Sequence, residues 1–131
     1  MSIKGIDNVG VAVRDLDAVA GFFEHTVGLD VTRDDEGRPR SASVQTGDRY
    51  LYVFETGGGP APVQRGGDLT TNSPGLDHVS FAVDDVDGAY ASLRRRGVPF
   101  EGEPESVDAW GIRLVRFCDP EGNAYYLVQS L

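Results

Sequence analysis

The sequence contains a single cysteine, Cys118, among 131 residues. An intrachain disulfide is therefore excluded, and so is a metal site built from clustered cysteines. No apolar run reaches the length of a membrane-spanning helix, and Met1 is not followed by the basic and apolar stretches of a secretory signal peptide. We therefore expect a cytoplasmic protein that does not interact with membranes.

Positive charge is also scarce. The chain has 12 Lys and Arg residues against 21 Asp and Glu residues, and its formal net charge is −9. A nucleic-acid-binding protein needs a basic surface to hold phosphates, so this balance argues against nucleic acid as a partner. An acidic surface keeps a protein soluble, and its electric field also favours cationic ligands.

One segment of the chain is present twice. Residues 6–17 return 70 positions later as residues 76–87. The identical pairs are Asp7/Asp77, Val9/Val79, Ala12/Ala82, Val13/Val83, Asp15/Asp85 and Asp17/Asp87. An internal repeat of this kind indicates two copies of one structural unit.

Each copy begins with a strand pattern followed by a helix pattern. In residues 8–13 and 78–83 the odd positions are bulky and apolar, whereas the even positions are small or polar. This alternation predicts a strand with one face for a helix and one face with room for a ligand. Asp15 and Asp85 occupy the N-cap position of the helix that follows. Gly28 and Gly97 are suited to its C-terminal end.

Three more strands complete each copy. They are predicted at residues 29–33, 41–46 and 49–55 in the first copy, and at residues 98–101, 112–118 and 124–129 in the second. We expect an α+β fold of two βαβββ modules that form one composite domain. The modules comprise residues 1–56 and 76–131, and residues 57–75 form a linker rich in Gly and Pro. This linker is long enough to place the second module against the first or on another subunit.

This pattern resembles the vicinal oxygen chelate superfamily, which includes glyoxalase I, extradiol dioxygenases and the fosfomycin- and bleomycin-resistance proteins. The resemblance covers essentially the whole chain. It rests on the paired Asp-x-Val-x-x-Ala-Val-x-Asp openings, Phe22-Phe23-x-x-x-Val27-Gly28-Leu29, and Trp110-Gly111-Ile112-Arg113 ahead of Asp119-Pro120-Glu121-Gly122-Asn123. It implies that the two modules form a cup-shaped half-barrel of eight strands, which holds a metal, a ligand or both.

The resemblance also implies where a metal would bind. Metal-using members place one ligand on the first strand and one on the last strand of each module, and these positions are Asn8, Tyr52, His78 and Tyr126 here. One imidazole, one amide and two phenols are a poor ligand set for a divalent metal. Glu55 lies three residues after Tyr52, and strand alternation turns it to the opposite face. We therefore expect no metal and no other cofactor.

A second use of the same positions is a ligand cavity. The residues expected to line it are Asn8, Tyr52, Phe54, His78, Ser80, Trp110 and Tyr126. Tyr and Phe side chains offer stacking area and hydroxyl groups, which suits a planar ligand. The alternative for the aromatic residues is that they only fill the core of a β-sheet. The alternative for His78 is a purely structural imidazole held by Tyr52, Tyr126 or Asn8. Trp110 follows a predicted loop at residues 101–109 and begins a strand, where it either packs or caps a ligand.

The leading hypothesis is a metal-free small-molecule binding protein of the bleomycin-resistance type. It would sequester an antibiotic or another natural product, an aromatic or cationic molecule, without catalysis. The alternative is a metal-independent isomerase, lyase or cyclase, with His78 as general acid/base and Tyr52 or Tyr126 polarising the substrate. A metal-dependent dioxygenase or epimerase is least favoured. Each module has open sheet edges, which predict a homodimer.

Overall fold

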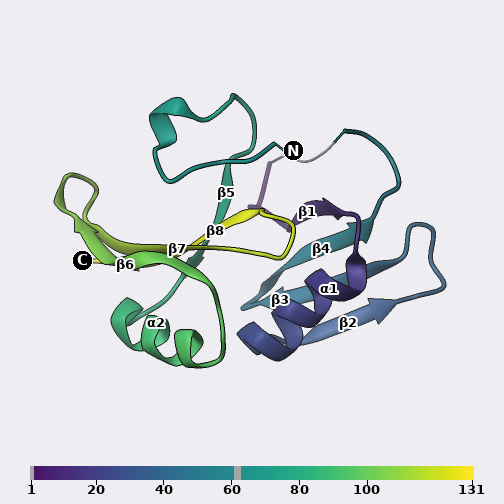
Figure 1. Cartoon of the computed structure of the whole chain (residues 1–131), viewed down its shortest axis with the longest axis horizontal. Helices are drawn as coiled ribbons and strands as arrows, with labels where there is room; N and C mark the ends of the chain where they lie inside the picture. Colours follow the sequence, from purple (N-terminus) through teal and green to yellow (C-terminus); the bar gives the residue numbers. More distant parts are fainter. Residues whose placement is uncertain (1, 61–62) are drawn as a thin grey trace. The chain divides into compact units, whose positions relative to one another are not determined.

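The computed structural model describes residues 2–60 and 63–131, and it divides the chain into two compact units, residues 1–60 and 61–131 (Figure 1). Unit 1 contains β1 (Asn8–Val13), α1 (Leu16–Gly21), the π-helix η1 (Phe22–Val27), β2 (Val31–Asp34), β3 (Ser41–Thr46) and β4 (Arg49–Glu55). Unit 2 contains η2 (Leu69–Thr71), β5 (His78–Ala82), α2 (Val86–Arg95), β6 (Phe100–Val107), η3 (Asp108–Trp110), β7 (Ile112–Cys118) and β8 (Ala124–Ser130). The predicted α+β class and the two βαβββ modules are confirmed.

The two sheets have the same topology. Their strand orders are β1-β4-β3-β2 and β5-β8-β7-β6, and in each sheet the first strand of the module runs parallel to the last. Gly10 pairs with Tyr52 in unit 1, and Ser80 pairs with Tyr126 in unit 2. Because Gly10 and Ser80 are equivalent in the repeat, the predicted alignment of Tyr52 with Tyr126 is confirmed.

A helix covers one face of each sheet (Figure 1). In unit 1, the fully buried side chains include Leu16 and Val19 from α1 and Val44 and Val53 from the sheet. In unit 2 the core is aromatic: the ring of Tyr125 stacks on Phe117 and Phe81, with centroids 5.4 and 5.7 Å away. The opposite sheet faces therefore hold those predicted site residues that belong to strands.

The caps of both helices agree with the sequence. The Asp15 carboxylate accepts a hydrogen bond from the Ala18 N–H at 3.0 Å, and that of Asp85 accepts one from the Gly88 N–H at 3.1 Å. These bonds satisfy N–H groups that have no partner inside the helix.

The first helix differs from the prediction of one regular helix. It is α-helical only to Gly21, and the Gly28 N–H donates to the Phe23 carbonyl, five residues earlier, at 3.0 Å. Phe22 and Phe23 are adjacent and both buried, and their rings meet edge to face. On a regular α-helix, two adjacent side chains point in different directions. The wider turn of the π-helix lets both rings face the core.

The predicted loop at residues 101–109 is wrong, because most of it belongs to β6. Glu101 pairs with Arg116 and Glu105 with Leu114, so Gly102, Glu103 and Pro104 all lie opposite Val115. Gly102 has φ of +84°, a conformation that favours glycine. The Gly and Pro of this bulge suggested a loop, but pairing with β7 on both sides of the bulge makes the segment a strand. Trp110 ends η3 rather than beginning a strand, since β7 starts at Ile112.

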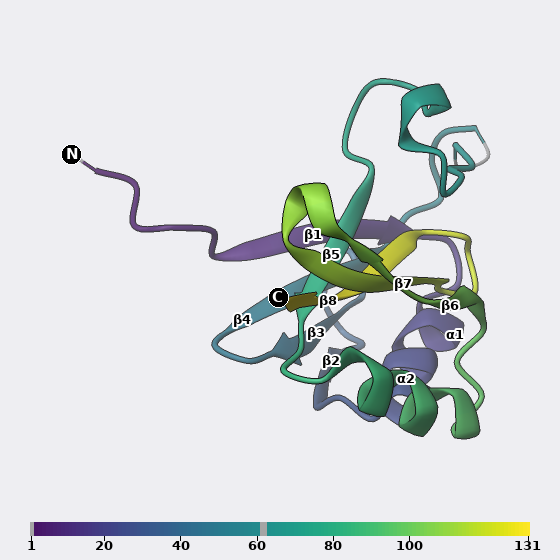
Figure 2. The ribbon, with the colours of Figure 1, turned by 90° about the vertical axis from the view of Figure 1, so that its left-hand side faces the viewer.

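The chain before β1 is exposed. Residues 2–7 continue away from β1 without joining the sheet (Figure 2). None of the helices formed by the described residues has the length and apolar character needed to cross a membrane.

Candidate functional site

The helix-free face of the unit 1 sheet is aromatic. Tyr52 and Phe54 project from β4, and their rings stack with centroids 5.5 Å apart. Tyr52 lies between Gly10 on β1 and Ser43 on β3 in the strand register. The half-buried Tyr52 ring therefore has small neighbours on both sides. Glu55 has the opposite parity and bonds Arg40, as the alternation predicts.

Asn8 lies on the same face as Tyr52 but is exposed and has a local partner. Its amide donates to the Asp7 carboxylate at 2.9 Å. The Tyr50 hydroxyl donates to the same oxygen at 3.4 Å. Asp7 therefore orients both polar groups at this end of the sheet.

The helix-free face of the unit 2 sheet carries His78, Ser80 and Tyr126. The His78 and Tyr126 rings meet edge to face, with centroids 4.6 Å apart. Tyr126 is only 7% exposed, whereas Ser80 is exposed. Burial raises the pKa of the Tyr126 phenol, and the nearby Asp77 charge adds to this, although Arg116 opposes it. Tyr126 is therefore a protonated hydrogen-bond donor at neutral pH.

His78 has a carboxylate partner. Its Nδ1 lies 2.6 Å from the Asp77 carboxylate, which also accepts from Asn72 at 2.8 Å and from Arg65 at 3.4 Å. The hydrogen bond from His78 lowers the pKa of Asp77, and the contacts with Asn72 and Arg65 lower it further, against the effect of burial. An ionised Asp77 accepts a hydrogen bond from the protonated Nδ1, which leaves Nε2 as the nitrogen with a free lone pair in the neutral ring.

The sequence-based partners of His78 were therefore incomplete. Within unit 2, Tyr126 contacts the imidazole edge to face, and Asp77 holds it by a hydrogen bond. Asp77 is one of the repeated acids, and its position directly before His78 was the available signal. Strand alternation groups residues two positions apart on one face, so it does not suggest a contact between the adjacent residues Asp77 and His78.

Arg116 is a site residue that the sequence reasoning missed. It lies beside Tyr126 in the register, is 6% exposed, and forms an ion pair with Glu101. Its Nη2 donates to the Arg65 carbonyl at 2.6 Å, while its Nε is buried without a hydrogen-bond partner among the described atoms. Burial would lower the pKa of Arg116, but the Glu101 bond and nearby negative groups raise it. A lone Arg between Val115 and Phe117 was the signal that could have identified it.

Trp110 lies away from this group. His78 pairs with Ala124 at the start of β8, whereas Ile112 pairs with Ser130 at its end. The end of the sheet next to Trp110 is thus roughly 20 Å from His78 along the strand. Trp110 is 62% exposed. Within unit 2 the fold brings His78, Ser80 and Tyr126 together, but not Trp110.

The metal-ligand positions do not fit a divalent metal. Within residues 2–60 and 63–131, no three His, Cys, Asp or Glu side chains lie close enough together to hold an ion. Each sheet face contributes one of the two tyrosines, and phenols are weak ligands for a divalent metal, the more so at Tyr126, where burial raises the pKa. We derive no chemistry through a metal at these positions.

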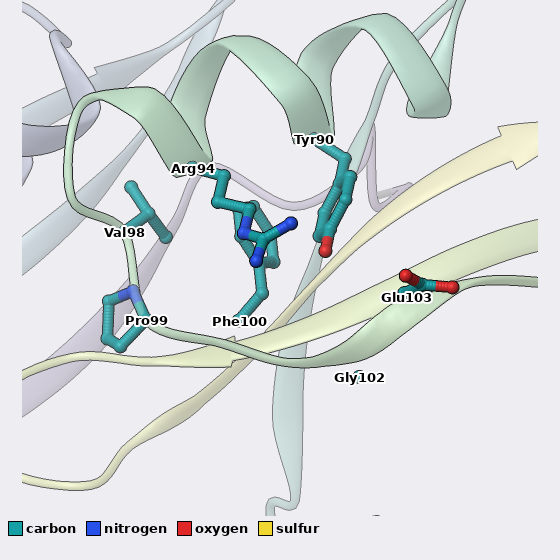
Figure 3. Close-up of a pocket in the computed structure, with 7 residues that line it drawn as sticks. All are labelled: Tyr90, Arg94, Val98, Pro99, Phe100, Gly102 and Glu103. Atoms are coloured by element: carbon teal, nitrogen blue, oxygen red, sulfur yellow. The ribbon is translucent and has the colours of Figure 1, made fainter.

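A cleft of about 410 Å³ lies on the other side of the unit 2 sheet (Figure 3). It is formed by α2, the turn after it and β6, and its lining residues are Tyr90, Arg94, Val98, Pro99, Phe100, Gly102 and Glu103. None of the predicted site residues is among them.

The sequence and structure were compared with known proteins. Residues 5–125 match the family model for the Glyoxalase/Bleomycin resistance protein/Dioxygenase superfamily. TnmS3, an antibiotic binding protein from Streptomyces sp. CB03234, is 28% identical, with a TM-score of 0.74 and coverage of 100% of this chain and 99% of TnmS3.

Two further relatives match over nearly their whole length. The uncharacterized protein YetH of Bacillus subtilis (strain 168) is 27% identical over 129 residues, which cover 95% of this chain and 98% of YetH. A glyoxalase family protein from Enterococcus faecalis is 22% identical, with a TM-score of 0.78 and coverage of 98% of this chain and 100% of that one. This last likeness concerns the fold alone.

Proposed function

Because the chain belongs to the glyoxalase/bleomycin resistance protein/dioxygenase superfamily, we propose that it is a metal-free protein that binds and sequesters a small molecule, an antibiotic or another natural product. The observation that carries this proposal is the pair of tyrosines, Tyr52 and Tyr126, at equivalent positions where metal-using members have ligands. The full-length similarity to the antibiotic-binding TnmS3 also supports it.

The side chains on the two sheet faces support a ligand with both planar and polar parts. The Tyr52 and Phe54 rings provide area for a planar group. Tyr126 offers a protonated hydroxyl, and His78 offers a basic nitrogen, so each pairs with a different polar group on the ligand. The acidic protein, with its net charge of −9, favours a ligand that carries positive charge.

Titration calorimetry tests the proposal with three probes: metal-free bleomycin, the planar cation proflavine and the planar anion anthraquinone-2-sulfonate. We expect the cationic probes to bind and the anion to bind more weakly. Each bound probe should be recovered unchanged by mass spectrometry and NMR. Failure of all three probes to bind at millimolar concentration contradicts the proposal, and so does recovery of a converted product.

Variants then locate the binding. Tyr52→Ala removes a stacking wall and should weaken binding about thirtyfold, or ~2 kcal/mol. Tyr126→Phe removes one hydroxyl and should weaken it about fivefold, or ~1 kcal/mol. Tyr90→Phe is the matched control, because Tyr90 lies on the helix side of the unit 2 sheet and should not affect binding.

A metal-independent enzyme is the second candidate, and the 2.6 Å contact between Asp77 and His78 favours it. The carboxylate orients the imidazole, Nε2 would accept a proton from the substrate, and the Tyr126 hydroxyl would donate a hydrogen bond to a carbonyl oxygen. Conversion of a bound probe by the wild-type protein, reduced about 100-fold or more in His78→Gln with little change in affinity, would establish this candidate.

A further inference from the structure

The cleft beside α2 has walls of different chemical character. Tyr90 and Arg94 extend from the last turns of α2, and the Arg94 guanidinium lies 5.8 Å from the centroid of the Tyr90 ring (Figure 3). The Phe100 ring of β6 packs directly beside Tyr90, with the centroids 4.9 Å apart. Pro99 and the buried Val98 extend the apolar wall. These side chains form the apolar part of a cleft whose accessible surface is otherwise mostly polar.

The bulge in β6 places a carboxylate at the same cleft. Without the bulge, alternation would put Glu103 on the face of Glu101, where Arg116 lies. The additional residues opposite Val115 change this direction, and Glu103 lines the cleft on the helix side. Bulges commonly redirect a side chain in this way, and they are frequent beside binding sites.

The two charged side chains at the cleft have no ion-pair partner among the described residues. Among the described residues, Arg94 contacts the Tyr90 ring and has no carboxylate partner, and the Glu103 side chain has neither an ion pair nor a hydrogen bond. By contrast, Arg65, Arg113 and Arg116 in the same unit are each paired with an acid. One cation and one anion are thus available at a cleft with an aromatic wall.

We propose that this cleft binds a small aromatic zwitterion, with its carboxylate on Arg94, its ammonium on Glu103 and its ring against Tyr90 and Phe100. The volume of about 410 Å³ lies within the range of small-molecule sites. A simple anion can pair with Arg94 alone, and a simple cation can pair with Glu103 alone. A molecule with both charges satisfies both side chains.

The test uses 4-(aminomethyl)benzoate, a rigid aromatic zwitterion, with benzoate and benzylamine as analogues that each lack one charge. Binding is followed by amide chemical shifts in two-dimensional NMR of the full chain. We expect the zwitterion to shift the amides of residues 90–103 that line the cleft and to bind more tightly than either analogue. Arg94→Gln and Glu103→Gln should each weaken binding about threefold, as for exposed ion pairs.

Arg95→Gln is the matched control, because it makes the same charge change on the next residue of α2 and does not line the cleft. The spectrum of each variant without ligand verifies its fold. Equal weakening by Arg95→Gln and Arg94→Gln, tighter binding of an analogue, or shifts centred on His78 and Tyr126 would overturn the proposal. Since this cleft shares no residue with the proposed natural-product site, either proposal can fail alone.

Discussion

Arg113 holds Asp87 through two hydrogen bonds, from Nε and Nη2 to the two carboxylate oxygens, each 2.9 Å long. The register makes Arg40 the equivalent of Arg113 in unit 1, and Arg40 bonds Asp17, the repeat equivalent of Asp87, at 3.0 Å. The same Asp–Arg pair therefore ties the first turn of each helix to the sheet, to β7 in unit 2 and to the residue just before β3 in unit 1.

The Asp87 pair should make stability depend on pH. The hydrogen bonds from Arg113 lower the pKa of Asp87 in the folded protein. The pair therefore stabilises the fold above the ordinary pKa of an Asp, and this contribution is lost as the pH falls through the lowered value. Urea unfolding should show Asp87→Asn less stable than wild type at neutral pH and equal to it in strong acid.

The matched control for that experiment is Asp84→Asn. Asp84 also lies near the start of α2, and its side chain has no hydrogen bond to another described residue. It should show little dependence of this kind. High salt should also reduce the Asp87→Asn effect, because both partners are solvent-accessible. A difference that persists unchanged at low pH would exclude the ion pair as its cause.

The contact between Asp77 and His78 predicts the tautomer of the imidazole. We expect the neutral ring to carry its proton on Nδ1 in the wild type, and Asp77→Asn should reduce this preference, because the amide binds the proton more weakly than the carboxylate does. Nitrogen chemical shifts of His78 measure the two forms. Asp7→Asn changes the repeat-equivalent residue and should leave the His78 signals unchanged. Identical tautomer populations in Asp77→Asn and wild type would refute the assignment.

Gly102 should be required by the backbone of the β6 bulge. Its φ is +84°, and a Cβ placed there meets nothing within 4 Å, so the cost of Gly102→Ala arises from the backbone alone. We expect a loss of about 1 kcal/mol in the free energy of unfolding. Gly57 has equally open space without a positive φ, so Gly57→Ala should be neutral or slightly stabilising. Equal effects in both variants would show that the left-handed conformation at Gly102 is not needed.

The ligand set predicts weak metal binding. After treatment with Ni²⁺, Zn²⁺ or Fe²⁺ and desalting, the protein should retain far less than one equivalent per chain, because His78 is the single imidazole among the four positions. Elemental analysis measures this directly. Stoichiometric retention that disappears in His78→Ala would overturn the metal-free proposal.

Assembly is the fifth prediction. β1 and β2 are the edge strands of one sheet, and β5 and β6 are the edges of the other. Unpaired edges are usually covered, so we propose a homodimer formed by packing of complete chains or by exchange of modules across residues 57–75. Sedimentation should show a dimer at micromolar concentration. A monomer throughout that range would contradict the proposal.

The sequence predicted those features that follow from short-range patterns. The repeat identified both modules, and alternation assigned Tyr52 and Tyr126 to the helix-free faces and Glu55 to the opposite one. The bounds of β3, β4 and β7 match the predicted strands because each has a regular alternation between clear turns.

Features that depend on a partner strand or on tertiary packing were missed. The bulge at Gly102 is stable because β7 pairs on both sides of it, which residues 101–109 alone do not reveal. The π-helical turn depends on a core that accepts both Phe22 and Phe23. The burial of Arg116 depends on Glu101 and on the Arg65 carbonyl, which are distant in sequence.

The first strand of each module separates two kinds of position, one on the exposed face and one in the core. In β1 and β5 every even-numbered residue is exposed, and every odd-numbered residue is at least partly buried. A mutation at Ala12 or Ser80 thus alters the surface that a ligand would meet, whereas a mutation at Val13 or Phe81 alters the packing under the helix. Substitutions at the even-numbered positions can therefore change the exposed face with little effect on packing, whereas substitutions at the odd-numbered positions disturb the core.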